Sequence, residues 1–298
     1  MFKKFNPLRP VLAILLIFIP LYPKFPLFSV TGTYVAIRLD DIIIALCVLI
    51  YFIYQIKQRF PVFKEKITPL FIAYFIAITL SFINAVLIFQ TDPFNILLLN
   101  LLRRFEYISL FFIVLSTIKS FSDLKFVYIS ALLTSIAVAA YGYGQKYLLF
   151  PVISTMNEEF SKGLLLQMDI WTRISSTFAG HYDLAAYLSV ILIIFGAVTL
   201  LQKNLLLRLT NIIIWLILFN LLTLTASRVS IFAYFGGFIF VLLIIKKYLW
   251  IIPVTLLFLF SLTNSKDLNQ RLLATIPALQ HQFFPTPLPS PSSTALPT

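Results

Sequence analysis

The feature that most constrains this chain is its series of long apolar runs, separated by short segments that carry most of the charge. A helix needs about 20 apolar residues to cross the roughly 30 Å hydrocarbon core of a bilayer. Runs of about this length, some shortened or interrupted by proline, lie at residues 11–22, 41–56, 67–89, 94–118, 124–148, 184–201, 207–225, 229–245 and 248–262. The pattern predicts an all-α, polytopic bundle of about nine transmembrane helices within residues 1–262.

Composition excludes a soluble domain. Hydrophobic residues make up 60% of the 298 residues, charged residues make up 11%, and the mean hydropathy is +0.96. The continuous runs also lack the alternation of a membrane β-barrel. The single cysteine, Cys47, can form neither a disulfide framework nor a cysteine-based metal site within the chain. His181 and His281 are a hundred residues apart, so we expect neither a metal site nor a cofactor.

Basic residues between the runs predict the orientation in the membrane. With a cytoplasmic N-terminus, the inner segments hold 13 basic and two acidic residues, and the outer ones hold 10 basic and eight acidic residues. We therefore expect an extracytoplasmic loop at about 150–183 and an extracytoplasmic segment at 263–298. Its last part, 285–298, is rich in Pro, Ser and Thr and is expected to be disordered. The net charge of +12 comes from basic residues that lie between the apolar runs, where they set the orientation in the membrane. We therefore expect no nucleic-acid partner.

Ionisable side chains near the outer membrane surface are the candidate functional residues, because charge at membrane depth is costly and usually serves function. Convergent guanidinium groups in a low-dielectric site bind phosphate or pyrophosphate oxygens bidentately. The candidates for such a site are Arg103, Arg104, Lys146, Arg173 and Arg228. We therefore predict an anion site on the extracytoplasmic face.

Three of these candidates have a structural alternative. Arg103 could pair with Glu106, which lies three residues away on the same helical face. Lys146 and Arg228 could be interfacial side chains that reach from a helix end into water. We favour function for Arg228, because several hydroxyl-bearing residues surround it in the sequence TLTASRVS.

Three stretches resemble the O-antigen ligase and O-antigen polymerase superfamily of bacterial polytopic envelope proteins. They are AIRLDDIIIALCVLIYFI at 36–53, RISSTFAGHYDLAAYLSVILI at 173–193 and LTLTASRVSIFAYFGGFIFVLLI at 222–244. The resemblance spans most of residues 30–262, and their order and spacing make the combination more specific than any single motif.

This resemblance implies a metal-independent glycosyltransferase. Such an enzyme moves a saccharide from undecaprenyl pyrophosphate to a hydroxyl of a glycan or lipid acceptor at the outer face of the bacterial cytoplasmic membrane. Motif matching carries pyrophosphate binding over to Arg173 and Arg228. It places His181 and Asp183 at a variable polar cluster, where they are weak candidates for catalysis.

The chain departs from that family after the ninth run. The family has a long outer loop with a catalytic histidine and then further helices, and residues 263–298 match neither. The resemblance therefore implies a truncated chain that binds the donor, and whose transfer activity depends on a missing part that holds the acid–base group. A membrane transporter for an anionic substrate is the alternative, and it would need an arginine site reachable from both sides. The sequence does not distinguish a ligase from a polymerase.

Overall fold

The computed structural model describes residues 6–28, 36–89, 93–153, 165–166 and 173–264. Within these residues the protein is all-α apart from two short strand pairs. Its nine helices are α1 (Leu8–Leu21), α2 (Leu39–Lys57), α3 (Thr68–Asn84), α4 (Phe94–Thr117), α5 (Phe121–Leu148), α6 (His181–Leu201), α7 (Leu205–Leu224), α8 (Arg228–Ile244) and α9 (Ile251–Asn264). Each apolar run in the sequence corresponds to one helix.

Short elements lie between these helices. The strand pairs are antiparallel and consist of β1 (Pro26–Phe28) with β2 (Ile37–Arg38), and β3 (Val152–Ile153) with β4 (Leu165–Leu166). The other short elements are the 3₁₀ turns η1 (Pro61–Lys64) and η4 (Tyr248–Trp250) and the π-helical turn η2 (Ala85–Phe89) that continues α3.

Five helical segments are long and apolar enough to cross a membrane. They are Leu39–Lys57, Thr68–Ile88, Phe121–Leu148, His181–Leu201 and Leu205–Leu224. The α4 helix has 24 residues, but every 18-residue stretch of it contains Arg103, Arg104 and Glu106. By helix length and hydropathy, the chain is a multi-pass membrane protein, as the sequence predicts.

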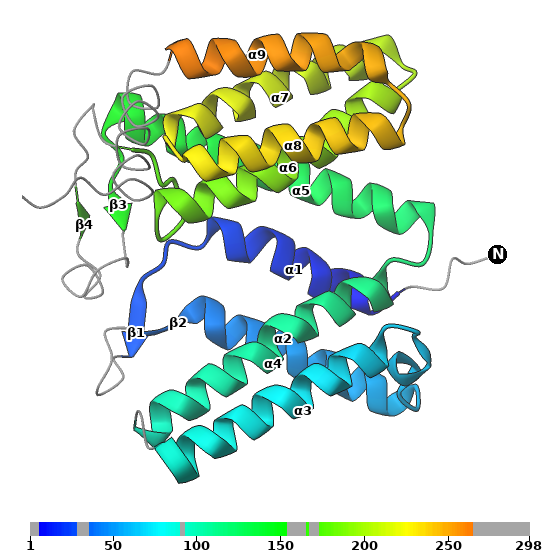
Figure 1. Ribbon diagram of the computed structural model, residues 1–298, viewed down its shortest axis with the longest axis vertical. Helices are drawn as coiled ribbons and strands as arrows, with labels where there is room; N and C mark the ends of the chain where they lie inside the picture. Colours follow the sequence, from blue (N-terminus) through cyan, green and yellow to red (C-terminus); the bar gives the residue numbers. More distant parts are fainter. Residues whose placement is uncertain (1–5, 29–35, 90–92, 154–164, 167–172, 265–298) are drawn as a thin grey trace, which may run out of the picture.

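Successive helices alternate in direction, so their connections gather at two opposite ends of the molecule (Figure 1). One end, on the left of Figure 1, carries both strand pairs, the start of α6 and the α7–α8 turn, and we call it the strand end. The other end carries the α2–α3, α4–α5, α6–α7 and α8–α9 connections, and we call it the opposite end. Residues far apart in sequence therefore meet at the strand end.

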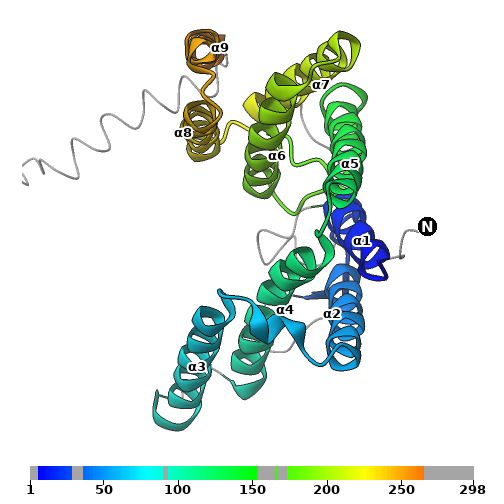
Figure 2. The ribbon, with the colours of Figure 1, turned by 90° about the vertical axis from the view of Figure 1, so that its right-hand side faces the viewer.

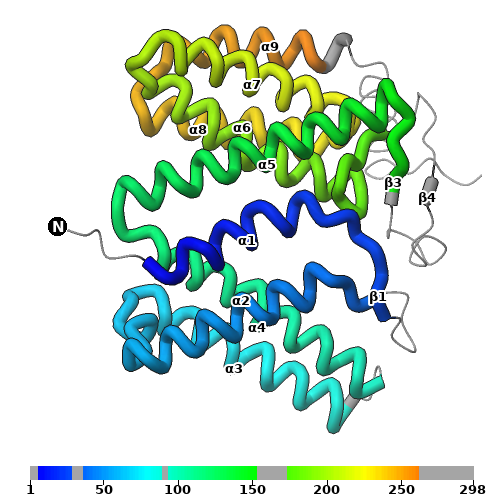
Figure 3. The backbone as a smooth tube through the Cα atoms, turned by 180° about the vertical axis from the view of Figure 1, so that it is seen from behind, coloured from blue at the N-terminus to red at the C-terminus, as the bar shows by residue number. Residues whose placement is uncertain are grey.

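Seen along the helices, the bundle is an open arc with α3 and α9 at its two tips (Figure 2). In the middle of the arc, α1 packs against α5 and so joins the α2–α4 half to the α6–α9 half (Figure 3). The α6 helix packs against both α7 and α8. Half of the apolar stretch of α6 is buried, whereas none of the stretch of α3 is, so α3 presents its sides to the lipid.

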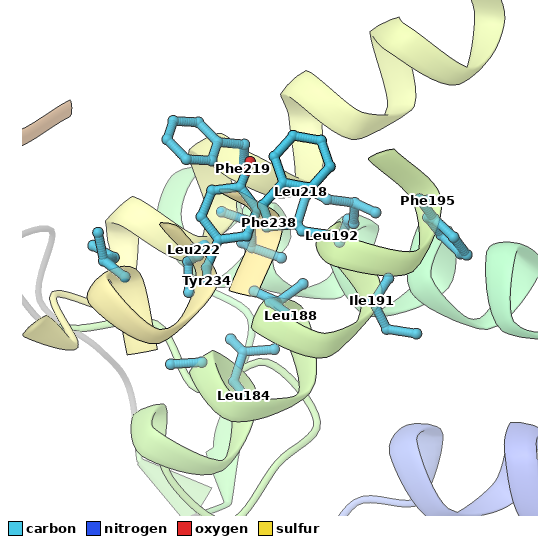
Figure 4. Close-up of a cluster of buried hydrophobic side chains, with 14 of the residues drawn as sticks. Leu184, Leu188, Ile191, Leu192, Phe195, Leu218, Phe219, Leu222, Tyr234 and Phe238 are labelled. Carbon is cyan, nitrogen blue, oxygen red and sulfur yellow. The ribbon is translucent and has the colours of Figure 1, made fainter. Parts of the chain in front are cut away.

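The main core lies along α6, where Leu184, Leu188 and Leu192 are each fully buried. They face aromatic side chains of α7 and α8, among them Phe219 and Tyr234 (Figure 4). Lipid tails are as apolar as leucine, so these contacts stabilise the bundle by close packing rather than by removal from water. This core positions the start of α6 and the α7–α8 turn at the strand end.

Candidate functional site

Residues 173–180, which we call the strap, lead into α6 as a non-helical segment at the strand end. Ile174, Ser175 and Ser176 are only 1%, 4% and 2% exposed. Irregular backbone within a membrane bundle must find hydrogen-bond partners inside the protein, because lipid offers none. The strap is therefore expected to be tied to the helices around it.

The strap is tied to helices on both sides. The Ile174 N–H donates to the Leu224 carbonyl at the end of α7, at 3.5 Å. The Thr177 hydroxyl donates to the Pro20 carbonyl in the last turn of α1. The strap thus supplies hydrogen-bond donors to carbonyls at the C-terminal ends of α7 and α1, which have no donor within their own helix. It also connects the two halves of the bundle.

Gln145, in the last turn of α5, clamps the middle of the strap. Its side chain is buried; Oε1 accepts from the Ser176 N–H at 2.7 Å, and Nε2 donates to the Ser176 carbonyl at 2.9 Å. Nε2 also lies 3.2 Å from the Pro151 carbonyl, and the Ser176 hydroxyl donates to the Val138 carbonyl at 2.7 Å. Two side chains thereby fix the backbone of the strap to α5.

Ser176 has a left-handed backbone conformation, with φ of 51°. This conformation costs a non-glycine residue about 1–2 kcal/mol. Such strain persists only where neighbouring groups hold it, and it concentrates at functional sites. The Gln145 clamp is the group that holds it, which makes the strap a candidate functional element.

Arg173 and His181 lie at the two ends of the strap. Arg173 Nη1 is 2.8 Å from His181 Nε2. A guanidinium can only donate, so His181 Nε2 accepts and the imidazole proton lies on Nδ1. In this geometry His181 orients Arg173 and is not itself available at Nε2 as a base. Asp183 is exposed on the first turn of α6, where the helix dipole favours a carboxylate.

Arg228 is the first residue of α8 and follows the tight α7–α8 turn. The Ser189 hydroxyl of α6 donates to the Ser230 carbonyl of α8 at 2.9 Å. Ser189 is eight residues beyond His181, and Ser230 is two residues beyond Arg228. The first turn of α8 therefore packs beside the third turn of α6.

The hydroxyl groups around Arg228 are largely engaged with the protein. Thr223 donates to the Asn220 carbonyl, and Thr225 donates to the Leu222 carbonyl, each at 2.7 Å. The Ser227 hydroxyl donates to that of Ser230, at 2.9 Å. Both threonines therefore already donate to α7, and the Ser227 hydroxyl is engaged with Ser230.

The structure brings Arg173 and Arg228 onto adjoining segments. The residue after Arg173 is hydrogen-bonded to Leu224, which lies four residues before Arg228. Arg228 is the first residue of α8, and Arg173 contacts His181 at the start of α6, so both lie near helix N-termini, where the helix dipole is positive. Such an arrangement is suited to an anion with several oxygens.

Arg103 and Arg104 occupy a different place. They lie about 14 Å along α4 from its start, near the middle of the helix, and α4 packs mainly against α1, α2 and α3. Glu106 interacts electrostatically with Arg103 and with Asp41 at the start of α2. The structure does not bring these two arginines to the strap. Lys146 lies beside Gln145 in the last turn of α5 and is partly exposed.

A second buried polar group, which we call the charge network, joins Lys24, Arg38 and Asp40. Lys24 Nζ lies 2.8 Å from Asp40 Oδ2 and donates to the Ile19 carbonyl at 2.7 Å, while Arg38 Nε is 3.3 Å from Asp40 Oδ1. The Lys24 and Asp40 side chains are 7% and 5% exposed. Burial lowers the pKa of Lys24, and the contact with Asp40 opposes that shift. Sequence reasoning missed Lys24, whose only signal is a lysine set between two prolines in YPKFP.

Residues 154–164, 167–172 and 265–298 lie outside the described part of the chain, and they include His281 and the expected disordered segment. Among the described residues, no three His, Cys, Asp or Glu side chains gather as a metal site would need. Comparison of the chain with protein-family models, with curated proteins and with solved structures found no match.

Proposed function

We propose that the protein binds an undecaprenyl-pyrophosphate-linked saccharide at the strand end and transfers the saccharide to an acceptor hydroxyl, as O-antigen ligases and polymerases do. The observation that carries the proposal is the placement of Arg173 and Arg228 on adjoining segments that a buried strap holds together. The resemblance of both segments to that superfamily supports the same assignment.

The chemistry explains why two arginines would be needed. The bond between the sugar anomeric carbon and a phosphate oxygen breaks, and the acceptor oxygen forms a new bond to that carbon. The leaving pyrophosphate gains charge as the bond breaks, and guanidinium forks stabilise this charge most in a site that excludes water. The acceptor proton must pass to a base. Because Arg173 engages His181 Nε2, we assign His181 a positioning role and leave the base unassigned.

The membrane setting suits a lipid-linked donor. Exposed apolar side chains cover the outer faces of the helices, so a polyprenyl tail would remain in the bilayer while its pyrophosphate reached the start of α8. The strap and the start of α8 both lie at the strand end, where such a headgroup would bind.

An anion transporter is the second candidate. The observation that favours it is the group of three charged residues near the middle of α4, where a carrier would place its substrate. In a transporter, Arg103 or Arg104 would be essential and Arg173 replaceable. In the proposed transferase the reverse holds.

Donor binding tests the proposal directly. Radiolabelled undecaprenyl pyrophosphate saccharide is titrated against the purified chain in detergent. We expect saturable binding that weakens by about 10–100-fold in Arg173→Ala and in Arg228→Ala, because each removes a charge-assisted hydrogen-bond donor set. Arg228→Lys should also bind more weakly, since a point charge does not replace a fork. Arg59→Ala is the matched control, because Arg59 is exposed at the opposite end. Full binding by both Arg173→Ala and Arg228→Ala would refute the site.

Cysteine labelling tests the orientation on which this site depends. In Cys47→Ala, cysteines at positions 157 and 264 should react with a membrane-impermeant maleimide from outside, and Lys64→Cys should react only after the membrane is opened. Lys64 lies in η1 at the opposite end. Labelling of all three positions from one side would contradict the topology.

A further inference from the structure

An apolar cavity of about 130 Å³ lies between α6, α7, α8 and α9. Its walls include Gly196, Trp215, Phe238, Trp250 and Leu257. These residues come from the second half of α6, from the middle of α7 and α8, from η4 and from α9, so the cavity lies toward the opposite end, away from the strap (Figure 1).

Fixed aromatic side chains shape this cavity. A Cβ atom at Gly196 would lie 2.5 Å from the Phe238 ring and 3.1 Å from Trp215 Nε1, so only glycine lets both rings approach α6 this closely. Trp215 Nε1 also donates to the Leu192 carbonyl at 3.1 Å, which fixes the orientation of the indole. A rigid, apolar cavity inside a membrane-spanning bundle suits a hydrocarbon chain.

A cation lies against one wall of the cavity. The Arg208 guanidinium lies over the Trp250 ring, 5.7 Å from its centroid, and Trp250 lines the cavity. Lys203, Lys246 and Lys247 are exposed on the two neighbouring connections. No aspartate or glutamate occurs between Asp183 and Asp267 in the sequence, so these connections carry no carboxylate of their own.

We propose that this cavity binds an acyl chain of an anionic phospholipid, whose phosphate group contacts Arg208 and the neighbouring lysines. Basic connections alone serve to orient a membrane protein and need no cavity. Here Arg208 stacks on Trp250, which is also part of the cavity wall. One molecule could therefore place an apolar tail in the cavity and an anionic head beside Arg208. Basic pockets between transmembrane helices are a known form of anionic-lipid site. This site is separate from the proposed donor site.

Native mass spectrometry of the detergent-purified full chain tests the proposal, with dioleoylphosphatidylglycerol and dioleoylphosphatidylcholine as probes. We expect saturable retention of the anionic lipid and little retention of the zwitterionic one. Arg208→Gln should weaken phosphatidylglycerol binding about fivefold, the effect of roughly one surface cation. Lys57→Gln is the control, because Lys57 is an exposed cation at the same end but on α2. An equal loss of phosphatidylglycerol binding in Arg208→Gln and Lys57→Gln would mean that the lipid is attracted to all the basic residues at the opposite end. That result would overturn the proposal.

A second pair of variants tests the cavity itself. Leu257→Trp adds bulk to the cavity wall, whereas Leu256 is 61% exposed and does not line it, so Leu256→Trp is the control. We expect Leu257→Trp to abolish phosphatidylglycerol retention and Leu256→Trp to preserve it; unchanged retention in Leu257→Trp would overturn the proposal. If Leu257→Trp loses its helical circular dichroism, Arg208→Gln decides the matter alone. Glycerol 3-phosphate should not displace the lipid, and displacement would identify a site for a free phosphate ester instead.

Discussion

The charge network and the strap are both buried at the strand end, but they are held in different ways. In the charge network, oppositely charged side chains bind one another. In the strap, the backbone is held by uncharged groups, namely the Gln145 amide and the Ser176 and Thr177 hydroxyls. The difference teaches that buried charge in this chain is not by itself a sign of function. The middle of the strap is thus held by neutral hydrogen bonds, and Arg173 lies at the end of the strap, in contact with His181.

The largest expected effect comes from breaking the charge network. Asp40→Ala leaves both Lys24 and Arg38 without their carboxylate, and removing one partner of a buried ion pair costs about 3–5 kcal/mol. Thermal unfolding in detergent, followed by circular dichroism, measures this loss. Glu65→Ala, at an exposed carboxylate, should change stability by less than about 0.5 kcal/mol. Equal stability of the two variants would mean that the network contributes little.

A smaller effect is expected when the uncharged clamp is removed. Gln145→Ala leaves the buried N–H and carbonyl of Ser176 without their partner, at a cost of about 2–4 kcal/mol. Donor binding should fall with it, because the strap that positions Arg173 loses its tie to α5. Gln58→Ala is the control, since Gln58 is exposed. Normal donor binding by Gln145→Ala would separate the strap from the proposed site.

The smallest effect tests how closely the strap approaches α5. A methyl group at Gly142 would lie 3.0 Å from Leu221 and 3.3 Å from Ile174, so Gly142→Ala should cost about 1–3 kcal/mol. Gly236→Ala is the matched variant, because a Cβ there meets no atom within 4 Å. It should be neutral or stabilise α8 by up to about 1 kcal/mol. Unfolding temperatures that move together in the two variants would contradict a close approach at Gly142.

The helices were predictable because their apolar runs are long and are interrupted by charge or proline. The run at 94–118 corresponds to α4 (Phe94–Thr117), which differs at its end by one residue. The start of α6 is less well predicted, because the polar residues His181 to Asp183 were assigned to the loop. They form the first turn instead, where an acidic side chain is favourable.

The contacts of the site were only partly predictable. The alternation of helices and the distribution of charge place Arg173 and Arg228 at one end. They do not reveal that Gln145 reaches Ser176, because that pair depends on how closely two segments 31 residues apart can pack. The pairing of Lys24 with Asp40 could not be predicted either, because the sequence shows where a charge lies along the chain but not which carboxylate it contacts in the fold.

The bond between the Pro20 carbonyl of α1 and Thr177 bears on the order in which the protein assembles during synthesis. Thr177 binds the Pro20 carbonyl and follows it by 157 residues. At about 5–20 residues per second, a ribosome reaches Thr177 roughly 8–30 s after Pro20. The 14 residues of α1 extend about 21 Å, less than the bilayer core, so this helix enters the membrane short and without its final partner. The bond between α1 and the strap can therefore form only late in synthesis, long after α1 itself has been made.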